Sequence, residues 1–277
     1  MAPAGRSQGE FRRAQHEGAR VSAPLVFITG ASSGIGQALA ERYAAAGWRL
    51  ALVARRTADM QAWAAAHGLG AERCVVYGAD VAQPDSIVPA GADCLVQQGL
   101  PDVVIACAGI SVGMDTAERA DLDVMRDMFA LNNVGLAATF HPFLPGMRER
   151  GAGTLVGVAS VSAIRGLPGH GAYCASKAGV VAYCESLRVE CRSQGVRVVT
   201  LVPGYVDTPL TAKNTYRMPF RLTPEAFAER AFRAIQAGRS YAVIPWQMAV
   251  VAKLLRVLPN AVFDRVLAGR GRKPRRS

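Results

Sequence analysis

The stretch LVFITGASSGIGQALA, residues 25–40, joins a short apolar run to a glycine-rich turn and then to an alanine-rich helical segment. Its first five residues predict a β-strand, and Gly30, Gly34 and Gly36 follow that strand directly. Such glycines give a tight turn and let the backbone approach a pyrophosphate, which the N–H groups and dipole of the following helix can bind. The spacing G-x-x-x-G-x-G departs from the usual G-x-G-x-x-G, so the stretch alone also permits a turn without a ligand.

Short β-branched runs alternate with helical segments along the rest of the chain. Several runs are almost continuously apolar, as expected for strands that are buried on both faces of a parallel sheet. This alternation predicts an α/β fold, a single doubly wound Rossmann-type domain with a seven-stranded, mostly parallel sheet and helices on both faces. Gly47 and Gly195 are expected to end helices in the left-handed conformation. The expected strands are residues 25–29, 49–54, 73–77, 102–107, 153–159, 196–202 and 241–245.

The domain is expected to span residues 24–245 and to include a substrate lid at about 209–225. Residues 1–23 contain no apolar run, so we predict a disordered extension there and no secretory signal. Residues 246–277 predict an amphipathic helix, a break at Pro259, a second short helix and a basic tail.

The formal net charge of +11 is distributed unevenly along the chain. Residues 253–277 hold eight Lys and Arg residues against one Asp, and the body of the domain is close to neutral. We therefore expect no nucleic-acid binding. The six cysteines show neither metal-ligand nor disulfide-framework spacing, which favours reduced thiols in a cytoplasmic protein and no metal site.

Residues 246–277 allow more than one partner. An apolar helical face opposite Lys253 and Arg256, followed by the basic tail, suits peripheral contact with the anionic inner face of a membrane. Alternatively, the segment packs on the substrate pocket of its own chain or on a partner subunit, because an apolar stripe is more often core than lipid-facing.

The end of the second predicted strand bears on the choice of dinucleotide. Sites for NAD usually place an acidic residue there to hold the ribose 2′-hydroxyl. Here Ala54 stands at that position and Arg55 and Arg56 follow it. A guanidinium can bind a 2′-phosphate with two hydrogen bonds, which favours NADP(H) over NAD(H). The alternative is a solvated pair of arginines at a strand end.

The sequence AYCASKAG, residues 172–179, places Tyr173 and Lys177 four positions apart. On a helix these side chains lie on the same face, where they could form an ordinary surface pair. Beside a dinucleotide site they have a second use. A phenol has a pKa of about 10, a nearby ammonium lowers it, and the phenol can then exchange a proton with an alcohol or carbonyl oxygen.

Taken together, these segments resemble the short-chain dehydrogenase/reductase family over residues 25 to about 245. The resemblance rests on TGASSGIG, GADV, CAG, NNVG, a serine 13 residues before YCASK, and VPGYVDT. It implies an NADP(H)-dependent oxidoreductase that interconverts a ketone or aldehyde and its alcohol, and assembly as a homodimer or homotetramer. A non-catalytic redox sensor that binds a dinucleotide and is anchored by its tail is the alternative.

The resemblance also implies roles for single residues. Tyr173 would transfer the proton, and Lys177 would bind the nicotinamide ribose and lower the pKa of Tyr173. Ser160 would hydrogen-bond the substrate oxygen, and Asn132 would hold a water that links Lys177 to solvent. The implied cofactor-binding residues are Gly30, Ser32, Ser33, Gly34, Ile35, Gly36, Arg55, Asp80, Val81, Ala108, Gly109, Tyr173, Lys177, Pro203, Gly204, Val206 and Thr208.

One segment departs from the family pattern. The usual NNAG after the fourth strand reads ACAG, Ala106 to Gly109, and we expect this to affect local stability more than chemistry. Cys107 is interpreted as a packed residue rather than a nucleophile.

The substrate is not identified by the sequence. The lid segment offers apolar side chains among cations, which suits an apolar, lipid-like substrate body with an anionic group, or simply docks the lid onto the domain. The residues concerned are Leu210, Lys213, Tyr216, Arg217, Met218 and Phe220.

Overall fold

β1 (Leu25–Thr29) pairs in parallel with β2 (Arg49–Ala54) on one side and with β4 (Val103–Ala106) on the other. The full sheet has the order β3-β2-β1-β4-β5-β6-β7 and is parallel throughout. Its other strands are β3 (Cys74–Gly78), β5 (Gly153–Val158), β6 (Val196–Pro203) and β7 (Tyr241–Ile244). Ligands bind such sheets at the carboxyl ends of the strands, beside the point where the strand order reverses, which here lies between β1 and β4.

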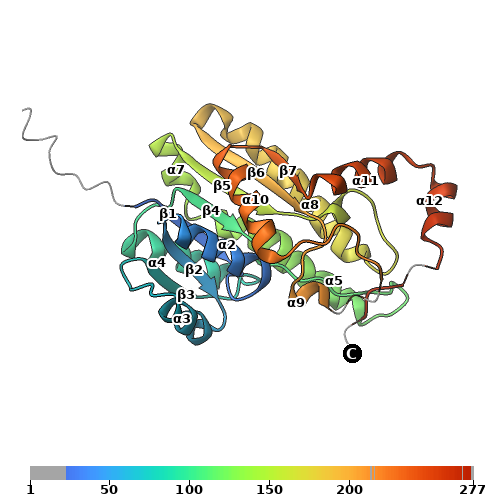
Figure 1. Cartoon of the computed structure of the whole chain (residues 1–277), viewed down its shortest axis with the longest axis horizontal. Helices are drawn as coiled ribbons and strands as arrows, with labels where there is room; N and C mark the ends of the chain where they lie inside the picture. The colour runs from blue at the N-terminus through green and yellow to red at the C-terminus, as the bar shows by residue number, and fades with distance from the viewer. Residues whose placement is uncertain (1–22, 213, 215, 270, 276–277) are drawn as a thin grey trace, which may run out of the picture.

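The computed structural model describes residues 23–212, 214, 216–269 and 271–275. The disorder predicted for residues 1–23 therefore concerns a segment outside the described residues, apart from residue 23. Within the described part, the seven-stranded sheet with helices around it confirms the predicted fold class (Figure 1).

Alternation along β1 explains the two-sided core. Val26 and Ile28 pack into the core on one face of the sheet, Leu25 and Phe27 pack into the core on the other, and all four are fully buried. A strand that must be apolar on both faces is the reason why the sequence shows a continuous apolar run. The first core includes side chains of α2 (Gly34–Ala45), α3 (Thr57–Ala66) and α10 (Pro224–Gln236), and the second those of α4 (Pro84–Gln97), α6 (Gly135–Phe140), α7 (Leu144–Arg150) and α8 (Gly171–Cys191).

Several sequence predictions can be compared with the structure directly. Gly47 and Gly195 have φ values of 82° and 70°, which confirms the expected left-handed helix ends. β1 and β2 have the predicted bounds, and no end of the other strands differs from its predicted position by more than one residue. α5 (Asp121–Phe129) continues through a π-helical turn, Ala130–Val134, into α6.

The C-terminal arm, residues 246–275, leaves the domain after β7. It contains α11 (Trp246–Val257) and α12 (Asn260–Leu267), separated at Pro259 as predicted. Figure 1 shows both helices at the end of the molecule opposite α3 and α4, with the chain then turning back towards α5 and α9 (Pro209–Ala212).

Arg165 fastens the bend between the two arm helices to the domain. Its guanidinium donates hydrogen bonds to the carbonyl of Leu258 (2.7 Å) and to Oδ1 of Asn260 (2.9 Å), and it lies 3.7 Å over the ring of Phe263. These contacts attach the arm to the domain at the bend between its two helices.

Candidate active site

A cavity of about 590 Å³ opens at the carboxyl end of the sheet, where β1, β2, β4, β5 and β6 end. Every cofactor-binding residue that the family resemblance implied lines this cavity, and so do Ser160, Tyr173 and Lys177. Asn132 is buried in the π-helical turn and is not one of the residues that line the cavity. The structure thus brings the predicted residues together, and their roles stay predictions.

The glycine loop fits a bound pyrophosphate because side chains are sterically excluded from it. A Cβ on Gly36 would lie 2.2 Å from the carbonyl oxygen of Gly30, and a Cβ on Gly30 would lie 2.8 Å from Cα of Ala108. Gly30 and Gly34 also have left-handed φ values of 68° and 55°, which other residues rarely adopt. The loop leads directly into α2, whose N-terminus faces an anion favourably.

The two arginines after β2 differ in their surroundings. Arg56 forms an ion pair with Asp59, with 2.6 Å between Nε and Oδ2. Arg55 is exposed and lines the cavity next to Ala54. After the neighbouring strand β3, Oδ1 of Asp80 accepts a hydrogen bond from the N–H of Ala82 at 3.0 Å. Of the pair, Arg55 is therefore the one that borders the cavity.

Tyr173 is the third residue of α8, and Ser160 is the second residue after β5. Burial raises the pKa of Tyr173 to about 12, and a hydrogen bond with the side chain of Ser160 acts in the opposite direction. Oγ of Ser160 also accepts a hydrogen bond from the N–H of Ser162 at 3.2 Å. The phenol is therefore protonated at neutral pH, which suits a proton donor.

Lys177 is buried and points to the end of β5. Its ammonium donates a hydrogen bond to the carbonyl of Val158 at 2.8 Å, and burial lowers its pKa to about 8. We expected Lys177 to bring the pKa of Tyr173 down, but that pKa is raised, because burial is the largest contribution to it. The part that Lys177 plays in setting this pKa beside a bound cofactor stays a prediction.

Asn132 connects the turn after β4 to α8. Its Oδ1 accepts a hydrogen bond from the N–H of Ile110 (3.0 Å), and its Nδ2 donates to the carbonyl of Ile110 (3.1 Å) and to Oγ of Ser176 (2.9 Å). A Cβ on Gly109 would lie 3.1 Å from Oδ1 of Asn132 and 3.3 Å from Nζ of Lys177. Both polar side chains therefore approach the same glycine, and the water expected between them stays a prediction.

The ACAG segment is held by a residue of β1. Oγ1 of Thr29 accepts hydrogen bonds from the N–H groups of Cys107 (3.2 Å) and Ala108 (3.3 Å). These bonds use the backbone of the turn, so they do not require amide side chains at its first two positions. Burial raises the pKa of the Cys107 thiol to about 12, which agrees with a packed rather than nucleophilic residue.

The substrate side of the cavity contains residues that the sequence analysis did not identify. His170, Tyr205, Asn214 and Lys273 line it, together with the predicted lid residues Leu210 and Tyr216. The centre of the His170 ring lies 6.4 Å from that of the Tyr173 ring. The position of His170, three residues before Tyr173, could have indicated from the sequence that it lies near the site. Nothing in the sequence connects Lys273, a hundred residues further on, with this site.

The other lid residues lie elsewhere. Phe220 is half-exposed, and Met218 lines a separate, neighbouring hollow. Neither residue lines the main cavity. Lys213 lies outside the described residues. Among the described residues, no helix is long and apolar enough to cross a membrane, and no three His, Cys, Asp or Glu side chains are grouped to hold a metal ion.

Comparisons with known proteins agree with this geometry. A family model described as short chain dehydrogenase matches residues 24–218. An uncharacterized oxidoreductase of Myxococcus xanthus is 39% identical over 249 residues, which is 89% of this chain and 97% of that protein. A short-chain dehydrogenase from Sphingobium yanoikuyae in complex with NADPH has a TM-score of 0.71 and 25% identity, covering 86% of this chain and 97% of its own. A 3-ketoacyl-(acyl-carrier-protein) reductase from Brucella melitensis, complexed with NADH, has a TM-score of 0.71 and 27% identity, covering 79% and 94%.

Proposed function

Because the chain belongs to the short-chain dehydrogenase/reductase family, we propose that it is an NADP(H)-dependent oxidoreductase that interconverts a ketone or aldehyde and its alcohol. The observation that carries the proposal is the single cavity in which Ser160, Tyr173 and Lys177 meet the glycine loop. Binding of a dinucleotide alone would not need this set of polar side chains. The set therefore favours an enzyme over the alternative, a redox sensor.

The residues of the cavity divide into two groups. The glycine loop and α2 would hold the pyrophosphate, Lys177 the nicotinamide ribose, and Pro203, Gly204, Val206 and Thr208 would border the nicotinamide. When it is bound, the nicotinamide supplies or accepts the hydride. The remaining chemistry, binding the substrate oxygen and moving one proton, belongs to the side chains of this chain.

Ser160 and Tyr173 would orient the substrate by hydrogen bonds to its oxygen atom. In the reductive direction the phenol of Tyr173 gives its proton to that oxygen, and in the oxidative direction a phenolate takes the proton back. A pKa raised to about 12 keeps the phenol protonated below that pH, so it favours reduction at neutral pH. The rate of alcohol oxidation should rise with pH, because the phenolate is the form that takes the proton.

We propose NADP(H) as the preferred cofactor. One structurally similar protein is bound to NADPH and another to NADH, so such similarity does not distinguish the two cofactors. The support for NADP(H) comes instead from the residues of this chain. Ala54 offers no carboxylate to a ribose 2′-hydroxyl, and the cation of Arg55 lies at the cavity. Both features suit a 2′-phosphate.

The proposal is tested by fluorescence titration with NADPH and NADH, followed by assays of cofactor oxidation with a panel of ketones and aldehydes. We expect NADPH to bind and at least one carbonyl compound to be reduced. Binding without turnover of any compound in a broad panel would favour the redox sensor. Absence of binding by both cofactors would show that the proposed function is wrong.

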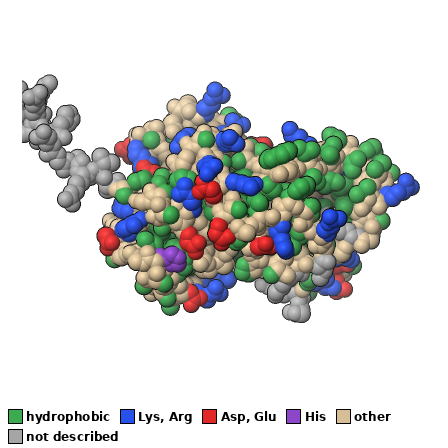
Figure 2. All heavy atoms as spheres, in the orientation of Figure 1, with side chains coloured by type: hydrophobic (Ala, Val, Ile, Leu, Met, Phe, Trp, Pro, Cys, Tyr) green, Lys and Arg blue, Asp and Glu red, His purple; other side chains and the backbone are tan. Residues whose placement is uncertain are grey.

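We further propose that the protein meets an anionic membrane surface through the arm helices. α11 exposes Trp246, Val250, Leu254 and Val257, which are spaced along one face, while Met248 is buried on the opposite side. Figure 2 shows hydrophobic side chains gathered over α11 and α12. An apolar stripe of this kind suits an interfacial helix.

The charges around the stripe support the same partner. Lys253 on α11 and Arg265 on α12 are exposed, and both would be attracted by anionic lipid headgroups. The described end of the tail does not add to this attraction, because Lys273 is buried and Arg272 and Arg275 pair with acidic residues. Membrane contact is therefore proposed for the helices, and the end of the tail packs on its own chain.

Replacing Leu254 with serine should weaken binding to anionic vesicles about tenfold, because burial of a leucine side chain stabilises by roughly 1.5–3 kcal/mol. The measurement is flotation with vesicles of anionic and of neutral phospholipid. Val96→Ser is the matched control, since Val96 is 87% exposed on α4 and Leu254 60% exposed on α11. A wild-type protein that does not float with anionic vesicles would contradict the proposal.

Assembly as a homodimer or homotetramer through the helices that carry Asn132 and Tyr173 is also proposed. Exposed apolar side chains on these helices support it, namely Leu122, Met125, Val134, Tyr183 and Val189. Sedimentation measures the assembly directly, and a monomer at micromolar concentration would contradict it.

A further inference from the structure

After α12 the arm returns to the domain as a short segment, residues 271–275, which we call the strap. The strap runs beside the loop that follows β4: Gly113 and Arg275 form a parallel bridge, and the N–H of Gly113 donates to the carbonyl of Pro274 at 2.9 Å. A Cβ on Gly113 would lie 2.0 Å from the carbonyl oxygen of Lys273. The contact is thus close enough to require glycine on the loop.

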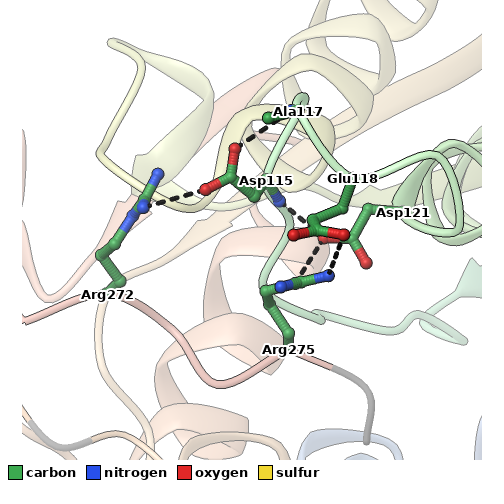
Figure 3. A network of polar contacts seen from close by, with 6 residues as sticks. All are labelled: Asp115, Ala117, Glu118, Asp121, Arg272 and Arg275. Atoms are coloured by element: carbon green, nitrogen blue, oxygen red, sulfur yellow. Dashed lines mark hydrogen bonds and ion pairs between the residues drawn. The ribbon is translucent and has the colours of Figure 1, made fainter.

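Two arginines fasten the strap from its outer side (Figure 3). Arg275 pairs with Asp121 at 2.7 Å and with Glu118 at 3.7 Å, and Arg272 pairs with Asp115 at 3.1 Å. The side chain of Asp121 is only 4% exposed, and Oδ2 of Asp121 also accepts a hydrogen bond from the N–H of Asp115. A pair with one buried member is screened less by salt than an exposed one, so Arg275 is the main fastening.

Lys273 stands between these arginines in sequence and reaches inward. It is 6% exposed and lines the cavity, where its ammonium donates to the carbonyl of Leu210 (3.0 Å) and to Oδ1 of Asn214 (2.7 Å). Burying an ammonium is costly unless it is hydrogen-bonded. Leu210 and Asn214 both belong to the predicted lid, and both line the cavity as well.

We propose that Lys273 is a positioning residue for the substrate, which holds the lid segment around Leu210 and Asn214 against the cavity while the strap holds Lys273. The inference rests on the proposed function, because it concerns the substrate side of that site. Ser160, Tyr173 and Lys177 belong to other elements, so their arrangement does not depend on this contact. Loss of the ammonium should therefore affect substrate binding rather than the proton-transfer step.

The experiment compares Lys273→Met, Lys273→Arg and the control Arg239→Met, which removes an exposed cation between α10 and β7. Hydrogen exchange followed by mass spectrometry reports on residues 209–214, and kinetics use the carbonyl compound that the wild type reduces fastest. We expect Lys273→Met to speed exchange in 209–214 and to raise KM about tenfold, with kcat within about twofold and NADPH affinity unchanged. Lys273→Arg should restore most of the loss, and Arg239→Met should match the wild type.

A second variant tests the strap without altering the cavity. Arg275→Gln removes the fastening to Asp121 and should speed exchange both at Gly113 and in 209–214, with a rise in KM in the same direction. Wild-type exchange in 209–214 for both Lys273→Met and Arg275→Gln would overturn the inference, and so would a fall in kcat without a change in KM. The exchange measurements need no substrate, so they decide the inference even if no carbonyl compound is turned over and the proposed function is wrong.

Discussion

Tyr173→Phe is expected to lower kcat for carbonyl reduction by about a thousandfold, within the range of roughly 10²–10⁴ that general acid catalysis contributes. The substitution removes the hydroxyl that donates the proton and keeps the ring, which packs among buried side chains beside Met114 and Met128. The affinity for NADPH should change by no more than a few-fold, because the glycine loop and Lys177 are untouched. The stability of the protein should also be almost unchanged.

The measurement pairs a single-turnover assay of NADPH oxidation with fluorescence titration of the cofactor. Tyr241→Phe is the matched control, since Tyr241 is exposed at the start of β7. It should behave as the wild type in both assays. Substantial turnover by Tyr173→Phe would assign the proton transfer to another group, and loss of NADPH binding would indicate damage to the site as a whole.

Arg55→Ala is expected to raise Kd for NADPH by 10- to 100-fold and to leave Kd for NADH within about threefold. A charge-assisted hydrogen-bonded contact with a phosphate contributes roughly 1.5–3 kcal/mol, which corresponds to this factor. NADH lacks the 2′-phosphate, so it should lose little when the guanidinium is removed. The variant should therefore bind the two cofactors with more nearly equal affinity.

The neighbouring Arg56 supplies the control for this experiment. Arg56→Ala removes a cation of the same kind one residue further on, but Arg56 is already paired with Asp59 on α3. We expect it to retain the wild-type preference in fluorescence titrations at equal ionic strength. If both variants lose NADPH affinity equally, the effect is one of general charge, and if neither does, the assignment of Arg55 to the 2′-phosphate is wrong.

The parts of the molecule that could be predicted from the sequence are those governed by local patterns. The apolar run of β1 predicts a strand covered on both faces, and the glycines after it predict a close backbone approach, which Gly36 makes to Gly30. The separation of four between Tyr173 and Lys177 predicts one helix face, and the cavity contains both side chains.

Other features depend on distant contacts or on burial, and no local pattern reports them. Lys273 reaches the cavity only because the arm bends at Arg165 and returns along Gly113, and neither step is visible in the residues around Lys273. The raised pKa of Tyr173 in the protein by itself follows from burial in the assembled site, which no spacing of residues along one helix reports. Sequence spacing predicted the positions, and the tertiary structure determined the electrostatics.

The strand order has a consequence for how the chain can assemble during its synthesis. β2 adds to β1 and β3 to β2, and then β4, β5, β6 and β7 add in turn on the other side, so each strand finds its neighbour already made. Since chains fold from the N-terminus as they emerge, the sheet can grow outward without inserting a strand between two others. The glycine loop can therefore form early, whereas the wall that contains Lys273 can be built only after residue 275 has emerged. In a nascent chain, the glycine loop would thus be in place before the cavity wall that contains Lys273 has been synthesised.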